Sequence, residues 1–218
     1  MTAGSTPQRT MKREQRRASI GRLLDSALHL FVSKGYHSTN LEQIAGAARL
    51  SKGAVYFYFG SKEAVLLELL KRVQAVVVDE ALKTAAAAGP RAADRIVAFL
   101  HHQAKLGVSH RDEVLLLILM SLEFGARKGP ASRLIGRIYR RLYGFVERLV
   151  REGQASGELR TDLQAREAAS IIMANHDGTF LEWYRRSGRL RGPALVRALR
   201  CVVLHGVARP EAPRRARR

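Results

Sequence analysis

Residues 51–62 combine side chains that suit contact with DNA. Ser51 precedes a predicted helix over 52–59, whose exposed start carries Lys52, Gly53 and Ala54. A helix start offers free backbone amides and the positive end of the helix dipole. Lysine can donate to guanine, glycine lets the backbone approach base edges, and an alanine methyl can touch a thymine methyl. Tyrosine hydroxyls and Lys62, at the start of the next helix, can contact phosphates, which fix register without reading sequence.

The segment before it predicts a short partner helix. Thr39-Asn-Leu-Glu42 has the spacing of a capping box, and Leu41, Ile44, Ala45 and Ala48 form one apolar stripe. The small Ala45 and Ala48 allow close packing of a second short helix after a tight turn, as in a helix-turn-helix. The alternative is a generic helical hairpin in which the aromatic run 56–59 lies in the core.

Longer helices enclose this pair. Ile20, Leu23, Leu24, Ala27, Leu28 and Phe31 form one apolar stripe before Gly35, which predicts a helix end. Ser61 can cap a long helix with Val65, Leu66, Leu69, Leu70, Val73, Val76 and Val77 on one face. The sequence therefore predicts four helices before about residue 80.

The motifs of this region resemble the TetR/AcrR family of bacterial transcriptional regulators. The stretches that carry the likeness are Gly35-Tyr-His-Ser-Thr-Asn-Leu-Glu-Gln-Ile-Ala45 and Leu50-Ser-Lys-Gly-Ala-Val-Tyr-Phe-Tyr-Phe-Gly-Ser-Lys-Glu63, within about residues 18–70. The resemblance implies a three-helix DNA-binding domain followed by a helical domain for effector binding and dimerisation. It places Ser38, Thr39, Tyr56, Tyr58 and Lys62 at phosphates and Lys52, Gly53 and Ala54 at base edges. The predicted DNA-binding residues are Ser38, Thr39, Ser51, Lys52, Gly53, Ala54, Tyr56, Phe57, Tyr58 and Lys62.

The charge balance favours a polyanionic partner. Among 218 residues, 38 Lys and Arg against 19 Asp and Glu give a net charge of +19. Both ends are basic, so we expect a flexible arm over 1–17 and a tail over 208–218. Between them we expect a DNA-binding domain over 18–72 and an effector-binding and dimerisation domain over 73–207.

Five further helical patterns fill the second domain, over 91–106, 111–125, 130–155, 163–186 and 192–207. The fold class is therefore all-α, with about nine helices. The segment 114–122 is apolar on every side and is expected at the centre of its bundle. Small and apolar residues on the last two helices predict a dimer interface. Its members are Ala168, Ala169, Leu195, Leu199, Val202 and Val203.

Aromatic and apolar residues with a few polar groups predict an effector pocket in the second domain. Its candidates are Phe99, Leu116, Met120, Phe124, Tyr139, Tyr143, His176, Phe180 and Trp183. The arginines of 130–155 are either a solvated face or an attraction for an anionic ligand, such as the phosphates of an acyl-coenzyme A. The histidines at 101, 102, 110 and 176 lack the spacing of a metal site, so we predict neither a metal nor a cofactor. Cys201 lies in an apolar stretch and is predicted to be buried and inert.

Together these features predict a ligand-responsive transcriptional regulator, most simply a repressor, that binds a palindromic operator as a homodimer and is released by a small, largely apolar effector. Activation or dual regulation remains open, because a helix-turn-helix contacts DNA in the same way for either outcome. An architectural or membrane-surface protein that uses its basic tails is the alternative, and it would bind without sequence preference. Catalytic motifs are missing, which argues against an enzyme. The lack of a signal-peptide core or a membrane-length apolar run predicts a cytoplasmic protein with no membrane partner.

Overall fold

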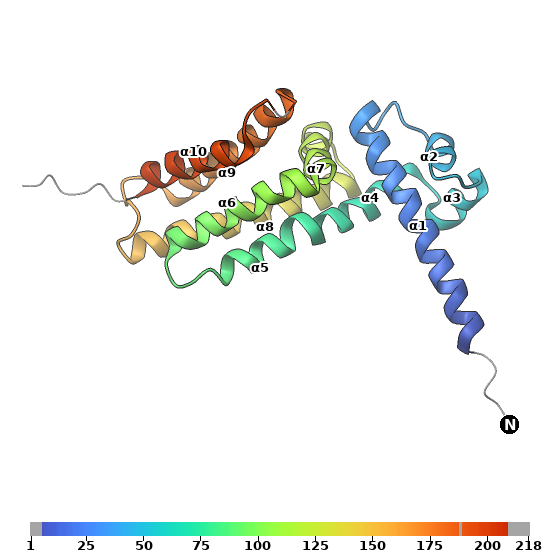
Figure 1. Cartoon of the computed structure of the whole chain (residues 1–218), viewed down its shortest axis with the longest axis horizontal. Helices are drawn as coiled ribbons and strands as arrows, with labels where there is room; N and C mark the ends of the chain where they lie inside the picture. Colours follow the sequence, from blue (N-terminus) through green and yellow to red (C-terminus); the bar gives the residue numbers. More distant parts are fainter. Residues whose placement is uncertain (1–5, 188, 209–218) are drawn as a thin grey trace, which may run out of the picture. The chain divides into compact units, whose positions relative to one another are not determined.

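The computed structural model describes residues 6–187 and 189–208, and these fold as helices without a strand (Figure 1). The α-helices are α1 (Thr6–Lys34), α2 (Leu41–Ala47), α3 (Lys52–Phe59), α4 (Lys62–Val73), α5 (Glu80–Ala86), α6 (Ala92–Ser109), α7 (Arg111–Phe124), α8 (Pro130–Ala155), α9 (Ala165–Arg185) and α10 (Gly192–Val207). A π-helical segment, Gln74–Asp79, joins α4 to α5 without a break. The described chain thus forms nine continuous helical rods, and the all-α prediction is confirmed.

The chain divides into two compact units. One holds the residues up to Gln74 together with Asp112–Gly136, and the other holds Ala75–Arg111 and the residues from Arg137 onward. The sequence placed everything after residue 72 in one effector domain. In the structure, α7 and the first turns of α8 instead group with the helices of the DNA-binding region, and the rings of Tyr36 and Phe124 meet within this unit.

The first unit has a dense apolar core. Leu23, Ala27 and Phe31 of α1 are fully buried, as are Val55 of α3 and Leu66 of α4. The ring of Tyr36, in the loop after α1, lies edge-on to Phe124 of α7, with 5.1 Å between ring centres. This contact fastens the end of α7 to the loop that precedes α2.

The basic N-terminal segment differs from its prediction. Residues from Thr6 to Arg17 continue α1 as regular helix, whereas a flexible arm was expected over 1–17. Helix formers such as Met11, Lys12 and Arg13 allow this extension. Residues 1–5 and all but the first residue of the predicted tail over 208–218 lie outside the described part.

The second unit buries Phe99 and Leu100 of α6, Ile138 and Leu149 of α8, and Ile172 of α9. Cys201 of α10 is exposed, so its predicted burial is wrong. Its neighbours Leu199 and Val203 take the inward positions, and a residue midway between two inward residues points to the other side of a helix. None of the described helices is long and apolar enough to span a membrane.

Candidate DNA-binding surface and ligand cavity

The first helix of the candidate pair starts at a capping box one residue later than predicted. The Asn40 side chain accepts from the Gln43 N–H at 2.9 Å, and the Gln43 side chain accepts from the Asn40 N–H at 2.9 Å. Both Thr39–Glu42 and Asn40–Gln43 have the required spacing, so the pattern alone did not choose between them.

Thr39 lies inside the structure rather than on the predicted phosphate-contacting surface. Its side chain is 1% exposed, and its hydroxyl donates to the Gly35 carbonyl at 2.9 Å. This burial corrects the expected role of Thr39, whose hydroxyl holds the turn between α1 and α2. Ser38, the residue before it, is exposed as expected.

The second helix, α3, presents its first turn to solvent. Ser51 caps it by accepting from the Ala54 N–H at 3.2 Å, and the exposed Lys52 and Gly53 follow. A Cβ atom at Gly53 would meet only the Ser51 hydroxyl oxygen, at 3.8 Å. Packing within the chain therefore does not require glycine here, which fits a backbone that a partner approaches closely.

The remaining residues of α3 divide between an inner and an outer face. Val55 is fully buried, whereas Tyr56 is half exposed and Phe57 is 79% exposed. Ala54 and Tyr58 are half-buried. An aromatic side chain as large as Phe57 left in water suggests a contact surface rather than the alternative of a core aromatic run.

Lys52 forms an ion pair with Glu42 of α2. Hydrogen bonding to Lys52, followed by its charge, lowers the pKa of Glu42, and the reciprocal hydrogen bond raises the pKa of Lys52. Glu42 was not among the predicted site residues. Its position ten residues before Lys52, on the facing helix of the pair, is the signal that could have found it.

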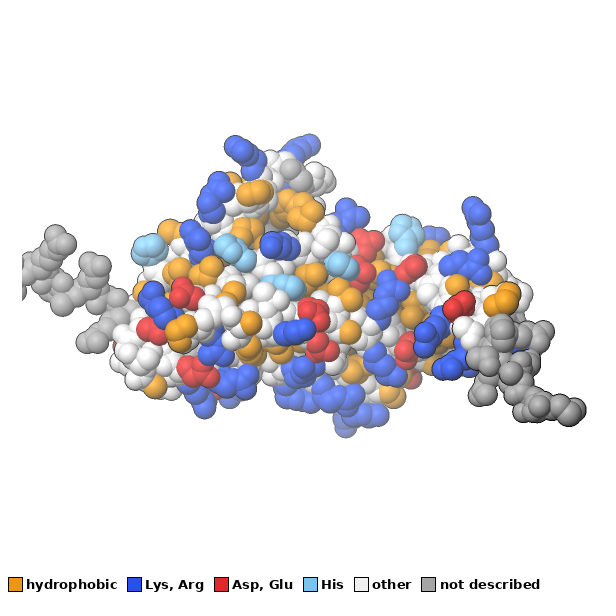
Figure 2. Space-filling model, turned by 60° about the horizontal axis from the view of Figure 1, so that its bottom comes forward, with side chains coloured by type: hydrophobic (Ala, Val, Ile, Leu, Met, Phe, Trp, Pro, Cys, Tyr) orange, Lys and Arg blue, Asp and Glu red, His pale blue; other side chains and the backbone are white. Residues whose placement is uncertain are grey.

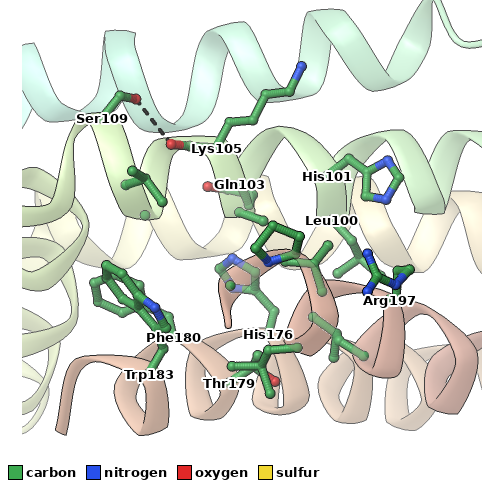
Figure 3. Close-up of a pocket in the computed structure, with 18 residues that line it drawn as sticks. Leu100, His101, Gln103, Lys105, Ser109, His176, Thr179, Phe180, Trp183 and Arg197 are labelled. Carbon is green, nitrogen blue, oxygen red and sulfur yellow. Dashed lines mark hydrogen bonds between the residues drawn. The ribbon is translucent and has the colours of Figure 1, made fainter. Parts of the chain in front are cut away.

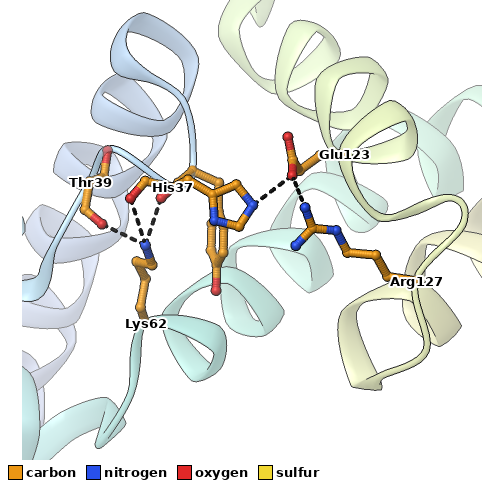
Figure 4. Close-up of polar contacts among 6 residues, drawn as sticks. His37, Thr39, Lys62, Glu123 and Arg127 are labelled. Carbon is orange, nitrogen blue, oxygen red and sulfur yellow. Dashed lines mark hydrogen bonds and ion pairs between the residues drawn. The ribbon is translucent and has the colours of Figure 1, made fainter.

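The side chain of Lys62 binds backbone carbonyls of the loop before α2. Its ammonium group donates to the carbonyls of Tyr36 at 2.8 Å and Thr39 at 2.7 Å, and more weakly to that of His37 at 3.4 Å (Figure 4). Burial lowers the pKa of Lys62. A lysine has three N–H donors, and all three point to this loop. Lys62 therefore holds the loop before α2, and its phosphate contact stays a prediction.

The same loop is joined to the end of α7. His37 Nε2 lies 2.6 Å from Glu123 Oε1, and Arg127 lies 2.7 Å from the same oxygen (Figure 4). Beside them, burial and then the nearby charge of Glu63 raise the pKa of Tyr36. The sequence did not predict this cluster, because its members are up to 90 residues apart and only the fold brings them together.

A cavity of about 630 Å³ lies in the second unit between α6, α9 and α10 (Figure 3). Phe180 and Trp183 lie together at one end, and His101 and Arg197 lie at the other. Its remaining lining residues are Leu100, Gln103, Ala104, Lys105, Gly107, Val108, Ser109, His176, Thr179, Gly192, Pro193, Leu195, Val196 and Leu199. A mostly apolar wall with a few polar groups is the usual composition of a small-molecule site.

Three predicted pocket residues, His176, Phe180 and Trp183, line this cavity. The His176 ring is buried and its Nδ1 lies 2.8 Å from Asp177. Gly107 allows α6 to approach the Phe180 ring, because a Cβ atom at this glycine would lie 3.0 Å from that ring.

The other predicted pocket residues lie elsewhere. Phe99 is in the core of the second unit, where its ring contacts His176. Tyr139 and Tyr143 of α8 lie 6.1 Å apart without lining this cavity, and burial raises the pKa of Tyr143. The three that belong to the first unit are Leu116, Met120 and Phe124. Periodicity identified these residues as inward-facing, but it could not show which inward faces enclose a cavity.

Some of the predicted dimer residues are buried within the chain, and others are exposed. Ala168, Ala169, Leu199 and Val203 are buried within the chain, and Leu195 lines the cavity. Val202 is 62% exposed, and Ile171 of α9, which was not predicted, is 63% exposed. A single chain therefore uses most of the predicted interface for its own packing.

Lys and Arg side chains are spread over the visible face and are more frequent there than Asp and Glu (Figure 2). On α8, Arg141 pairs with Asp79 at 2.6 Å, Arg151 pairs with Glu147, and Arg148 lies over the Phe145 ring. These contacts favour the reading of a solvated basic face. Within residues 6–187 and 189–208, no group of His, Cys, Asp or Glu could hold a metal ion.

Comparison with known proteins identifies the family. Residues 23–69 match the model of the tetR family of bacterial regulatory proteins, and residues 92–208 match the C-terminal domain of BetI-type transcriptional repressors. The second match alone spans more than half of the chain. The chain belongs to the tetR family, and it is a transcriptional regulator rather than an enzyme.

Three relatives illustrate the likeness. The MbdR regulator from Azoarcus sp. CIB is 45% identical, with a TM-score of 0.79 over 86% of this chain and 98% of that one. A regulator from Saccharomonospora viridis, solved with choline, is 25% identical, with a TM-score of 0.75 over 91% of this chain and 100% of that one. The fatty acid metabolism regulator protein of Bacillus subtilis is 24% identical over 89% of this chain and 98% of its own length.

Proposed function

We propose that this regulator is a repressor that binds a palindromic operator as a homodimer and releases it on binding a small, largely apolar effector. The observation that carries the proposal is the first turn of α3, where Ser51 caps the helix and Lys52 and Gly53 stand exposed. In a helix-turn-helix protein, this end of the second helix contacts base edges in the major groove.

The side chains around that turn have two proposed roles: some contact DNA, and others hold the loop before α2. Lys52, Gly53 and Ala54 face base edges in this proposal, and Ser38, Ser51, Tyr56 and Tyr58 contact phosphates, with Phe57 beside them. Thr39 and Lys62 hold the loop before α2 through buried or carbonyl-directed hydrogen bonds. In this proposal the phosphate contacts fix the register on the DNA, and Thr39 and Lys62 support them by holding the loop.

The proposed dimer uses the outward faces of α9 and α10. Ile171, Ala174 and Gly178 follow one exposed line on α9, and Ala198 and Val202 follow another on α10. These small and apolar side chains allow two copies of the helix pair to approach closely. A two-fold dimer then presents two α3 helices to half-sites about one helical turn apart.

The proposed effector site is the cavity between α6, α9 and α10. Its volume of about 630 Å³ and its apolar walls suit an acyl or aromatic group, with His176 and Thr179 as polar contacts. An acyl thioester of coenzyme A is one such compound, and the name of the Bacillus subtilis relative points to fatty acid metabolism.

Selection from a random pool of DNA duplexes tests operator binding. The wild-type chain is expected to enrich a palindrome, and Lys52→Met should enrich a motif with less preference at one position of each half-site. Lys12→Met, an exposed change in the first turns of α1, is the matched control and should keep the wild-type motif. Enrichment of unrelated sequences by the wild-type chain would instead indicate an architectural DNA binder.

Fluorescence of Trp183, the chain's single tryptophan, tests the effector site, because this residue lines the cavity. Octanoate, octanoyl-coenzyme A and choline serve as probes, and octanoyl-coenzyme A is expected to change the emission and weaken operator binding about 5–150-fold. Ala104→Phe, which fills the cavity, should abolish both effects, whereas Ala86→Phe, at an exposed position on α5, should abolish neither. Operator release by octanoyl-coenzyme A that persists in Ala104→Phe would place the effector elsewhere.

A further inference from the structure

Gln103 of α6 lies between the ligand cavity and the π-helical segment that precedes α5. Its side chain is 3% exposed and lines the cavity. Its Nε2 donates to the Val77 carbonyl at 3.3 Å, while its Oε1 has no hydrogen-bond partner in the described part of the chain. A buried acceptor without a hydrogen-bond partner is unfavourable, so a rotamer that gives Oε1 a partner would be lower in free energy.

Val77 belongs to the π-helical segment Gln74–Asp79. A π-helical turn holds more residues than an α-helical turn, occurs rarely, and is frequent at functional sites. The segment is anchored at several points in the second unit, since Val77 and Val78 are buried and Asp79 pairs with Arg141 at 2.6 Å. The Gln103 amide adds a donor for a backbone carbonyl of this segment.

The π-helical segment lies in the chain where a change of helix type would affect α4. It directly follows α4, and only Gly60 and Ser61 separate α4 from the candidate DNA-reading helix α3. An α-helical turn holds fewer residues than a π-helical turn, so the same six residues rotate further about the axis as α-helix and shift the phase between the flanking helices by about the 100° of one residue. Conversion of the π-helical segment to α-helix would therefore turn α4 about its axis with respect to α5.

We infer that Gln103 is the residue through which an effector changes the helix type of Gln74–Asp79. The inference rests on the proposed role of the cavity as the effector site. A ligand with a hydroxyl or amide N–H on a largely apolar body can pair with Gln103 Oε1 once the side chain turns toward the cavity. That turn removes the donor from the Val77 carbonyl, and the segment closes into α-helix.

Hydrogen exchange of backbone amides tests the link without a ligand or an operator. Gln103→Met keeps the length of the side chain and removes its amide. It should change exchange over residues 74–82 about tenfold or more. His101→Met is the control, because His101 lines the same cavity without a hydrogen bond to the segment. Equal exchange over 74–82 in Gln103→Met and the wild-type chain would overturn the inference.

Deletion of Ala75, an exposed residue of the segment, removes the extra residue and gives a second test. In the deletion background, Gln103→Met should have no further effect on exchange over the same region, because the carbonyl no longer needs its donor. The deletion also keeps the phase between α4 and α5, because the missing residue offsets the tighter α-helical turn, so operator binding should stay within a few-fold of wild type and should lose its response to octanoyl-coenzyme A. Operator release by octanoyl-coenzyme A that matches the wild type in the deletion variant would overturn the inference.

These outcomes separate the inference from the proposed function. If the wild-type chain selects no operator, the proposed function fails, and the exchange experiments still decide whether Gln103 controls the segment. If the operator is found but exchange is insensitive to Gln103, the inference alone fails.

Discussion

The two candidate sites are built in opposite ways. The DNA-binding surface is exposed, and short-range hydrogen bonds from Asn40 and Ser51 fix its two short helices. The cavity is concave and mostly apolar, and it is enclosed by α6 and by the consecutive pair α9 and α10, which comes much later in the sequence. The first site therefore depends on individual polar groups, and the second depends on how well long helices pack.

The largest expected effect is on stability, and it compares a residue in the dense core of the first unit with one at the cavity of the second. Phe31→Ala removes a fully buried ring and should lower the free energy of unfolding by about 3–5 kcal/mol. Phe180→Ala should cost less, about 2 kcal/mol, because Phe180 already faces a cavity. Chemical denaturation followed by circular dichroism measures both, and equal losses would contradict the contrast between the two regions.

The sequence predicted the first region better because its determinants are local. The cap at Ser61 is confirmed, and Ser51 caps α3 in the same way, since a hydroxyl before a helix needs only the next three residues to form its bond. The helix ends near Gly35, Pro90 and Gly157 were also predictable from their turn residues. Thr39 was misplaced because its hydrogen bond to Gly35 depends on the path of the loop after α1.

The second region was harder to predict because periodicity identifies inward faces without pairing them. Leu116 was correctly predicted to be buried, but it lies in the first unit. Leu195 was predicted at a dimer interface and lines the cavity. The π-helical segment had no signal in the sequence, since its residues fit an α-helical stripe equally well.

The next largest effect concerns base recognition at the DNA-binding surface. Lys52→Met should lower the affinity for the preferred base pair by a factor of about 5–150 and relax specificity there. Titration of operator variants that differ only at that base pair measures the discrimination. Lys71→Met, a change at an exposed lysine of α4, is the control. Unchanged discrimination in Lys52→Met would remove Lys52 from the reading surface.

A smaller effect tests whether Lys62 holds the loop before α2 or contacts DNA. Lys62→Met removes the donors for the Tyr36 and Thr39 carbonyls and should lower the free energy of unfolding by about 1–2 kcal/mol. Operator affinity should fall with it, but the slope of log affinity against log salt should stay constant, because no phosphate contact is lost. A slope reduced by about 0.9 would instead show that Lys62 contacts a phosphate.

The smallest expected effect tests the ion pair that links the two short helices. Glu42 holds Lys52 in the free protein, and it also places a negative charge beside a surface that approaches phosphates. Glu42→Gln should therefore strengthen binding to unrelated DNA a few-fold, because repulsion falls. Binding to the operator should gain less, because Lys52 loses the partner that orients it, so the ratio of operator to unrelated affinity falls. Glu68→Gln, at an exposed acid paired with Lys71 on α4, is the control and should change neither affinity. An equal gain for both kinds of DNA in Glu42→Gln would show that Glu42 acts by charge alone and does not position Lys52.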